Sequence, residues 1–128
     1  MTSVPEVSMV DRNACPAFHA AVELIGRRWN GAIIDVLLGR SRRFSELRAA
    51  ITDITPAMLS ARLKELEAAG LVHRDVSGDR PIEVSYSLTD TGRQLSAVLD
   101  AVAVWSLAWS GESGEERRWN SASIPSAS

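Results

Sequence analysis

The spacing of apolar residues predicts two helices in the first third of the chain. The first should begin at Pro16, because proline suits the first position of a helix, and should end at Gly26. A second helix is expected over residues 30–38, with Gly39 as its C-terminal cap. The apolar residues that recur at helical spacing in these two segments are Phe18, Val22, Ile25, Ile33, Ile34, Leu37 and Leu38.

Two further helices, joined by a tight turn, are predicted next. Ser45 can cap a short helix, which should stop at the turn over residues 52–54. Thr55 and Pro56 have the residue types of an N-cap and a first helical position, and the helix that they start should end at Gly70. The apolar residues expected on the inner faces of this pair are Leu47, Ile51, Leu59, Leu63 and Leu66.

Beyond this pair the helical spacing gives way to strand-like segments. Residues 71–76 and 83–88 have the composition of strands, and the turn-forming residues 77–81 between them predict a hairpin. The second segment alternates polar and apolar residues, so one of its faces should be buried. A last helix, capped by Thr89 or Thr91, should follow. Its apolar seam, at spacings of three and four, is formed by Leu95, Val98, Val102, Trp105 and Trp109.

This order of elements indicates the fold class. Over residues 44–88 a short helix, a tight turn, a second helix and a two-stranded hairpin give the layout of a winged helix-turn-helix, a mainly α fold with a small β-hairpin wing. Residues 14–109 are expected to form this domain, and the length of 128 residues fits a single domain. Residues 1–13 are expected to be a flexible N-terminal arm, and residues 110–128 a disordered tail with few apolar residues.

The distribution of charge changes what the net charge of −2 implies. A negative total argues against nucleic acid, but residues 40–80 hold eight basic and six acidic residues, whereas the rest of the chain holds six basic and ten acidic ones. A phosphate backbone responds to the local field, so this segment can still bind one. The longest run without a charge, residues 101–111, is shorter than the roughly 20 residues of a membrane helix, and the N-terminus lacks the apolar stretch of a secretory signal. We therefore expect a cytoplasmic protein with no membrane contact.

Few residues offer metal or catalytic chemistry. A single cysteine, Cys15, excludes a disulfide within the chain, and with the distant His19 and His73 it does not make a standard zinc site. The chain has no glycine-rich phosphate loop and no Ser-His-Asp arrangement. Glu65 and Glu67 lie on a helix flank, where surface charge explains them. We expect no metal, no cofactor and no enzymatic activity.

The second helix of the central pair offers a candidate reading surface. With its leucine stripe inside, helical geometry places Ser60 on one shoulder and Arg62 beside the stripe, from which the long arginine stem could reach outward. Small residues let a helix lie deep in a major groove, and the N–H groups near Thr55 can hold a phosphate. The alternative is a protein-binding winged helix in which Arg62 and Lys64 are solvated surface charges. The residues expected to face outward are Ala57, Ala61, Lys64 and Ala68.

An ordered set of motifs resembles the HxlR-type winged helix-turn-helix regulators of bacteria over about residues 14–109. The segment 58–72 is also found in MarR-like and ArsR-like regulators. The ordered set is more specific, because it includes Cys-Pro before the first helix and a tryptophan in the first turn. The motifs that carry the resemblance are Cys15-Pro16, residues 25–29, Arg43-Phe44-Ser45-Glu46-Leu47, residues 58–72 and Val84-Ser85-Tyr86-Ser87-Leu88-Thr89.

The resemblance implies a homodimer that binds double-stranded DNA at an inverted repeat and regulates nearby genes, with repression as the favoured mode. The first and last helices would form the dimer interface. The alternative is that the apolar seam packs on the first helix of the same chain. Arg43 and Ser45 would touch phosphate, and Arg74 and Arg80 would serve the wing, although acidic residues flank them. The reading surface would comprise Thr55, Ala57, Met58, Ser60, Ala61, Arg62 and Lys64.

The resemblance also implies two candidate inputs. Some relatives use a cysteine just before the first helix as a redox or electrophile sensor, and Cys15 holds that position. The alternative for Cys15 is an inert small residue at the dimer interface. A pocket for a small-molecule effector is the second candidate, although aromatic residues at helical spacing are more often core. The residues assigned to the pocket or the dimer interface are Phe18, His19, Val22, Trp29, Leu95, Val98, Val102, Trp105 and Trp109.

Overall fold

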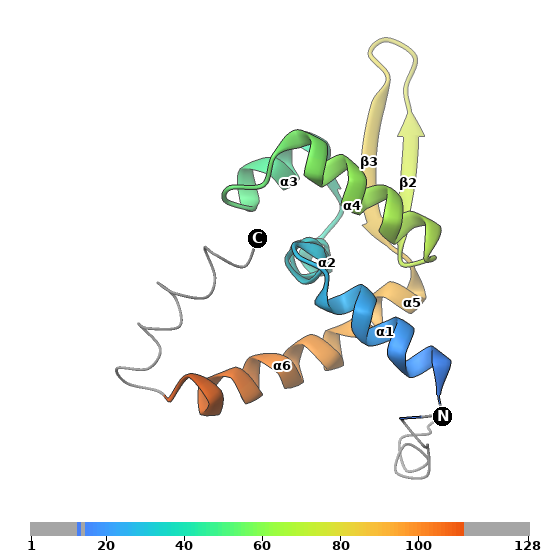
Figure 1. Ribbon diagram of the computed structural model, residues 1–128. Helices are drawn as coiled ribbons and strands as arrows, with labels where there is room; N and C mark the ends of the chain where they lie inside the picture. Colours follow the sequence, from blue (N-terminus) through green and yellow to red (C-terminus); the bar gives the residue numbers. More distant parts are fainter. Residues whose placement is uncertain (1–12, 14, 112–128) are drawn as a thin grey trace.

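In the computed structural model, helices make up most of the described residues, 13 and 15–111, and three short strands form one small sheet (Figure 1). The arm and the tail expected at the two ends lie outside the described residues, apart from Asn13, Ser110 and Gly111. The elements are α1 (Pro16–Gly26), α2 (Asn30–Gly39), β1 (Arg42–Arg43), α3 (Phe44–Ala50), α4 (Pro56–Ala68), β2 (Val72–Ser77), β3 (Glu83–Leu88), α5 (Asp90–Arg93) and α6 (Leu95–Ser110).

The predicted helices and the predicted hairpin are present. α1 begins at Pro16, and α4 begins at Pro56, as expected from the N-terminal prolines. β2 is shifted by one residue from the predicted strand, and α2 includes Gly39, which was expected to follow it as a cap. The two-residue strand β1 was not predicted, because two residues are too few to show a period.

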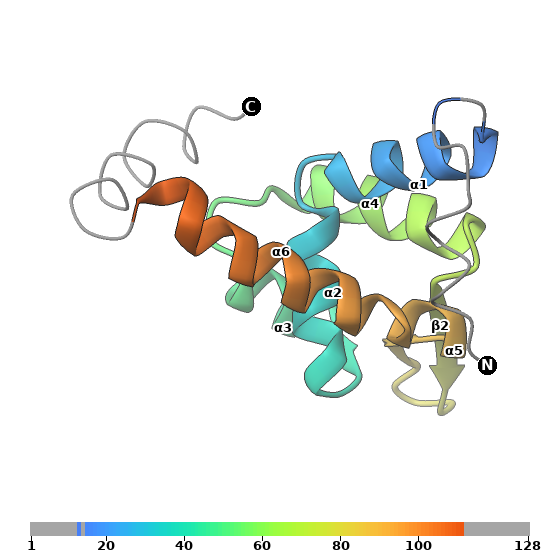
Figure 2. The same cartoon turned by 90° about the horizontal axis from the view of Figure 1, so that it is seen from below.

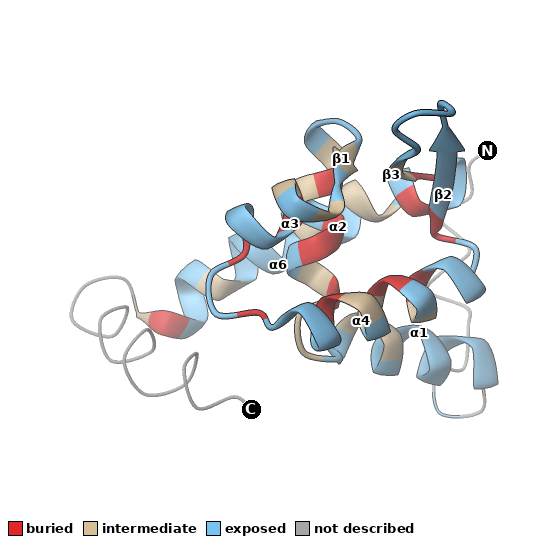
Figure 3. Cartoon of the chain, turned by 90° about the horizontal axis from the view of Figure 1, so that it is seen from above, coloured by how far each residue is buried: buried red, intermediate tan, exposed pale blue. Residues whose placement is uncertain are grey.

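Helix α2 lies at the centre of the fold. It packs against α1, α3, α6 and β3, and Figure 2 shows α6 running across it. Ile33 and Ile34 are fully buried because neighbours surround the helix on several sides. Figure 3 shows buried residues gathered along α2 and along one side of α4. One continuous core results, formed by Ile33, Ile34, Leu37, Leu47, Ile51, Ile54, Leu59, Leu63, Leu66, Leu71, Val72 and Leu88.

The start of α3 differs from the prediction. Ser45 was expected to cap this helix, but it is the second residue of the helix, and Arg43 holds the N-cap position. The reason is the short strand β1, which pairs with β3 (Arg42 opposite Tyr86) and keeps the backbone extended up to the first helical residue. Glu46 reaches back, and its Oε1 accepts a hydrogen bond of 2.8 Å from the Arg43 N–H.

The burial of β3 also differs from the prediction. The sheet order is β1-β3-β2, and both pairings are antiparallel. Instead of one buried face, β3 has a gradient along its length, from exposed Glu83 through four half-buried residues to buried Leu88. The neighbouring β2 is buried only at Val72. Figure 1 shows the cause, because the hairpin projects away from the core and only its base is covered.

The last predicted helix is divided at Gln94 into α5 and α6. Thr89 caps α5 by accepting a hydrogen bond of 3.0 Å from the Gly92 N–H, and Thr91 is not the cap. Thr89 also donates from Oγ1 to the Gly70 carbonyl at 2.7 Å and from its N–H to the Leu71 carbonyl at 3.0 Å. These bonds join the end of the hairpin to the end of α4, and they bring Gly92 against the Leu71 carbonyl.

Gly92→Ala is expected to lower the free energy of unfolding by about 1–3 kcal/mol, because the new Cβ would overlap the Leu71 carbonyl oxygen and force the backbone apart. Gly31→Ala is the matched control, since an added Cβ there meets no atom within 4 Å. It should be neutral or stabilising by up to about 1 kcal/mol. The measurement is urea unfolding at one fixed protein concentration. Equal effects of the two substitutions would contradict the close approach at Gly92.

Candidate nucleic-acid interface

Helix α4 presents the outward face expected for a reading helix. Ala57, Ala61, Lys64 and Ala68 are all exposed, whereas Leu59, Leu63 and Leu66 are buried on the opposite side. Ser60 is half-buried on one shoulder, and Met58 is 36% exposed on the other. Thr55 caps the helix, because its side chain accepts a hydrogen bond of 3.1 Å from the Met58 N–H. The exposed surface therefore combines small side chains with one lysine and a helix N-terminus.

Arg62 does not extend outward, contrary to the reach expected from its long stem. Its side chain is only 18% exposed, and its guanidinium contacts Glu65 with 2.8 Å between Nη1 and Oε1. The Arg62 Nε also lies 3.4 Å from the Met58 sulfur. The carboxylate holds the guanidinium along the helix flank, so Lys64 is the exposed cation of α4 in this structure.

Glu65 is the residue that the sequence interpretation missed, because it was taken as surface charge. Its Oε2 lies 2.9 Å from the Arg27 Nε at the end of α1. Its Oε1 accepts a hydrogen bond of 3.3 Å from the Asn30 amide, which also donates to the Leu24 carbonyl at 2.8 Å. A spacing of three between Arg62 and Glu65 was the one available signal, but nothing local in the sequence pointed to Arg27 or Asn30.

The N-terminus of α3 gathers several charged side chains. Arg43 and Ser45 are exposed there, and the Arg43 Nη1 lies 3.8 Å from Glu83 of β3. The backbone N–H of Arg43 lowers the pKa of the Glu46 carboxyl, with help from the positive charges of Arg40 and Arg43. A hollow of about 230 Å³ lies among these groups, lined by Arg40, Ser41, Arg42, Arg43, Glu46, Glu83 and Ser85.

The wing residues lie on the projecting hairpin. Arg74 belongs to β2 opposite Tyr86, and Arg80 lies in the turn beyond it. Both are exposed, as are their acidic neighbours Asp75 and Asp79. Figure 1 shows α3, α4 and the hairpin together on one side of the molecule, and α1 and α6 on the other. The structure thus brings the predicted DNA-binding elements to a common side.

The opposite side carries a large apolar surface on α1 and α6. Trp105 and Trp109 are 59% and 52% exposed, and their rings stack with centroids 5.3 Å apart. The seam therefore does not pack on the first helix of the same chain over these residues. Leu95, in contrast, is half-buried against the core. The apolar residues exposed on this side are Phe18, Val22, Val98, Val102, Val104, Trp105, Leu107 and Trp109.

Trp29 is separate from this surface. It is half-buried against the core at the α1–α2 corner, and its φ of 81° lies in the left-handed region. The Arg28 guanidinium lies 4.4 Å from the centre of the Trp29 ring. Trp29 thus packs against the core at this corner, whereas Trp105 and Trp109 are exposed on α6.

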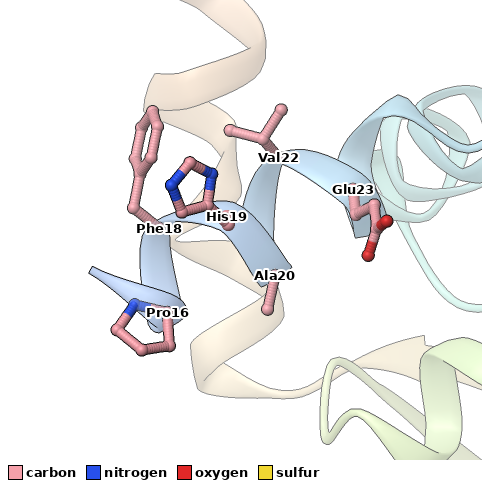
Figure 4. A pocket seen from close by; sticks show the side chains of 6 residues that line it. All are labelled: Pro16, Phe18, His19, Ala20, Val22 and Glu23. Atoms are coloured by element: carbon pink, nitrogen blue, oxygen red, sulfur yellow. The ribbon is translucent and has the colours of Figure 1, made fainter. Parts of the chain in front are cut away.

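The two larger hollows on the α1 side of the molecule have different linings. One, of about 650 Å³, is an open depression along α1, where the Phe18 and His19 rings meet edge to face at 5.6 Å (Figure 4). Its lining is Pro16, Phe18, His19, Ala20, Val22 and Glu23. The other, of about 340 Å³, lies between α1 and α5–α6. It is mostly apolar and is lined by Ala21, Leu24, Ile25, Leu71, Thr91, Gln94, Leu95 and Val98.

Cys15 lies at the N-cap of α1. It is half-buried, and its sulfur accepts a hydrogen bond of 3.4 Å from the Phe18 N–H. Cys15 therefore lies at the start of the helix that carries the exposed Phe18 and Val22.

Comparisons with known proteins agree with this geometry. The uncharacterised HTH-type transcriptional regulator YvaP of Bacillus subtilis is 43% identical over 95 residues, which is 74% of this chain and 88% of that protein. The reduced form of the B. subtilis regulator YodB superposes with a TM-score of 0.72 and 39% identity, over 77% of this chain and 97% of that structure. The quinone-bound form of B. subtilis YodB superposes with a TM-score of 0.65 and 40% sequence identity, over 72% of this chain and 97% of that structure.

A family description, HxlR-like helix-turn-helix, matches residues 24–114, which include every element from α2 to α6. This match confirms the resemblance over a range that includes Arg43-Phe44-Ser45-Glu46-Leu47 and residues 58–72, whereas Cys15-Pro16 lies outside the matched residues. Among the described residues, no helix is long and apolar enough to cross a membrane. On the agreement of fold, motifs and relatives, the chain belongs to the HxlR-like helix-turn-helix family.

Proposed function

We propose that this protein is a sequence-specific DNA-binding transcriptional regulator that works in the cytoplasm as a homodimer, without enzymatic activity. Repression of genes beside an inverted-repeat operator is the favoured mode. The observation that carries the proposal is the exposed face of α4, where alanines and Lys64 stand clear of the core. A helix with small outward residues can lie in the major groove, which is wide enough for one helix.

The other DNA contacts follow from the arrangement of elements. Seating α4 in the groove brings the capped helix start at Thr55 toward a phosphate, which its unpaired N–H groups can bind. At the start of α3, Arg43 and Ser45 are exposed and would contact the adjacent segment of the DNA backbone. On the hairpin, Arg74 and Arg80 are exposed and would contact the neighbouring segment of the DNA backbone. Phosphate contacts of this kind position the protein, and the α4 side chains read the bases. That reading surface is formed by Ala57, Met58, Ser60, Ala61 and Lys64.

The apolar surface of α1 and α6 supports the homodimer. Stacked Trp105 and Trp109 leave more than half of their surface in water in the single chain, and aromatic rings of this size are strongly favoured at interfaces. In such a dimer a twofold axis would relate the two α4 helices. Binding to an inverted repeat requires that they reach successive major grooves, about 34–36 Å apart.

Two inputs are proposed for the regulator. Cys15 would sense oxidants or electrophiles, an assignment supported by its helix N-cap position and by the solved quinone-bound form of the relative YodB. The hollow of about 340 Å³ between α1 and α6 would receive a small apolar effector. Both positions adjoin the proposed dimer interface, so each input could change the spacing of the two α4 helices.

The test of function is selection of bound fragments from genomic DNA, followed by affinity measurements at several salt concentrations. We expect an inverted repeat and a steep loss of affinity with salt, because each phosphate contact releases counterions. Lys64→Ala should make the slope of log K against log salt shallower by about 1. Arg93→Ala removes one exposed positive charge from α5 and should leave the slope unchanged. Failure to enrich any sequence would favour a protein-binding winged helix.

Trp105→Ala is expected to shift the monomer–dimer equilibrium toward monomer, because it removes the largest exposed apolar side chain from the middle of the proposed interface. Ile82→Ala is the matched control, since Ile82 is exposed to a similar extent (63% against 59%) but lies on the hairpin. Sedimentation velocity over a concentration series gives the equilibrium constant. An unchanged constant for Trp105→Ala would place the interface elsewhere.

Cys15→Ser should retain DNA binding and lose the response to diamide or a quinone. The serine hydroxyl can still accept the cap hydrogen bond, and Cys15 is the one cysteine of the chain, so the variant offers no thiol. Fluorescence anisotropy with labelled operator, before and after treatment, measures the response. If treatment still lowers or raises the DNA affinity of the Cys15→Ser variant, Cys15 is not the sensor.

A further inference from the structure

A single carboxylate, that of Glu65, holds three donors from three places in the fold. Arg62 lies one turn earlier on α4, Arg27 is the C-cap of α1, and Asn30 begins α2. Glu65 is 29% exposed and Arg62 only 18%, so the pair is partly withdrawn from water. Asn30 is fully buried, and its amide donates a hydrogen bond of 3.3 Å to the Glu65 Oε1. The result is a polar cluster that fastens the flank of α4 to the α1–α2 corner.

The cluster determines where the charge of Arg62 lies. Arg62 follows Ala61, a residue of the outward face, by one helical step, so a free stem could carry its guanidinium to a DNA backbone. Instead the Oε1 of Glu65 and the sulfur of Met58 hold it along the flank. Without this restraint α4 would present two cations to DNA rather than Lys64 alone.

We infer that Glu65 is a positioning residue, which keeps Arg62 off the DNA backbone and so sets the sequence-independent part of the affinity of α4 for DNA. The inference rests on the proposed DNA-binding function. A phosphate contact strengthens binding to every sequence alike and therefore adds affinity without discrimination. Withholding Arg62 therefore lowers the affinity for operator and for random DNA by the same factor and leaves their ratio unchanged.

The test compares Glu65→Gln with Glu67→Gln on operator and on random DNA of the same length, over a range of salt. Both variants remove one negative charge from α4, but exposed Glu67 is not part of the Arg27–Arg62–Asn30 cluster. Glu65→Gln should steepen the slope of log K against log salt by about 0.9, the value for one added phosphate contact. A fourfold rise in salt should then cost about 3.5-fold more affinity than in the wild type. The affinities for operator and for random DNA should rise by the same factor, so that their ratio does not change.

Arg62→Gln separates the release of Arg62 from other effects. In the wild-type background Arg62→Gln should leave the slope of log K against log salt unchanged. In the Glu65→Gln background it should abolish the increase in slope that Glu65→Gln causes. If Glu65→Gln does not fold, Arg62→Gln alone decides, because a slope shallower by about 1 would show that Arg62 already contacts phosphate. That result, or equal shifts for the Glu65 and Glu67 variants, would overturn the inference. Absence of DNA binding by the wild type would instead overturn the proposed function, and the inference with it.

Discussion

The arrangement of the molecule depends on one threonine between the wing and the last helices. Thr89 binds the carbonyls of Gly70 and Leu71 and caps α5 at the same time. Gly70 and Leu71 lie between α4 and β2, so these bonds join the end of α4, the base of the hairpin and the start of the α5–α6 segment at one point. The approach of Gly92 to the Leu71 carbonyl keeps this junction tight. The hydrogen bonds of Thr89 therefore tie the start of the α5–α6 segment to the end of α4.

The parts of the fold that the sequence predicted are those with strong local signals. α1 and α4 each begin with a proline after a capping residue, and the leucine stripe of α4 marks its buried side. The parts that were wrong depend on distant contacts. Ser45 does not cap α3 because pairing of β1 with β3 starts the helix earlier, and β3 lacks one buried face because the hairpin leaves the core. Neither feature is indicated in the sequence by a local periodicity or by a capping residue.

The same distinction applies to the candidate site. Outward positions such as Ala61 and Lys64 follow from helical geometry, and the structure places them there. The position of Arg62 could not be predicted, because it depends on a carboxylate that Arg27 and Asn30 hold from another helix pair. Burial of a charged group requires a partner, and the partner is visible only in the folded chain. The periodicity of apolar residues predicts which face of a helix is exposed. Whether a long charged side chain on that helix extends into solvent depends on ion pairs with other elements of the fold.

The stacked tryptophans of α6 have a consequence for how the protein behaves at low abundance. Apolar surface that leaves water only on association stabilises the folded state by mass action, so in a dimer closed by Trp105 and Trp109 the thermal stability of each protomer rises with its concentration. Occupancy of an operator that requires the dimer would vary with the square of the protomer concentration while dimers are scarce. The regulator would then respond to its own dosage more steeply than a monomeric binder.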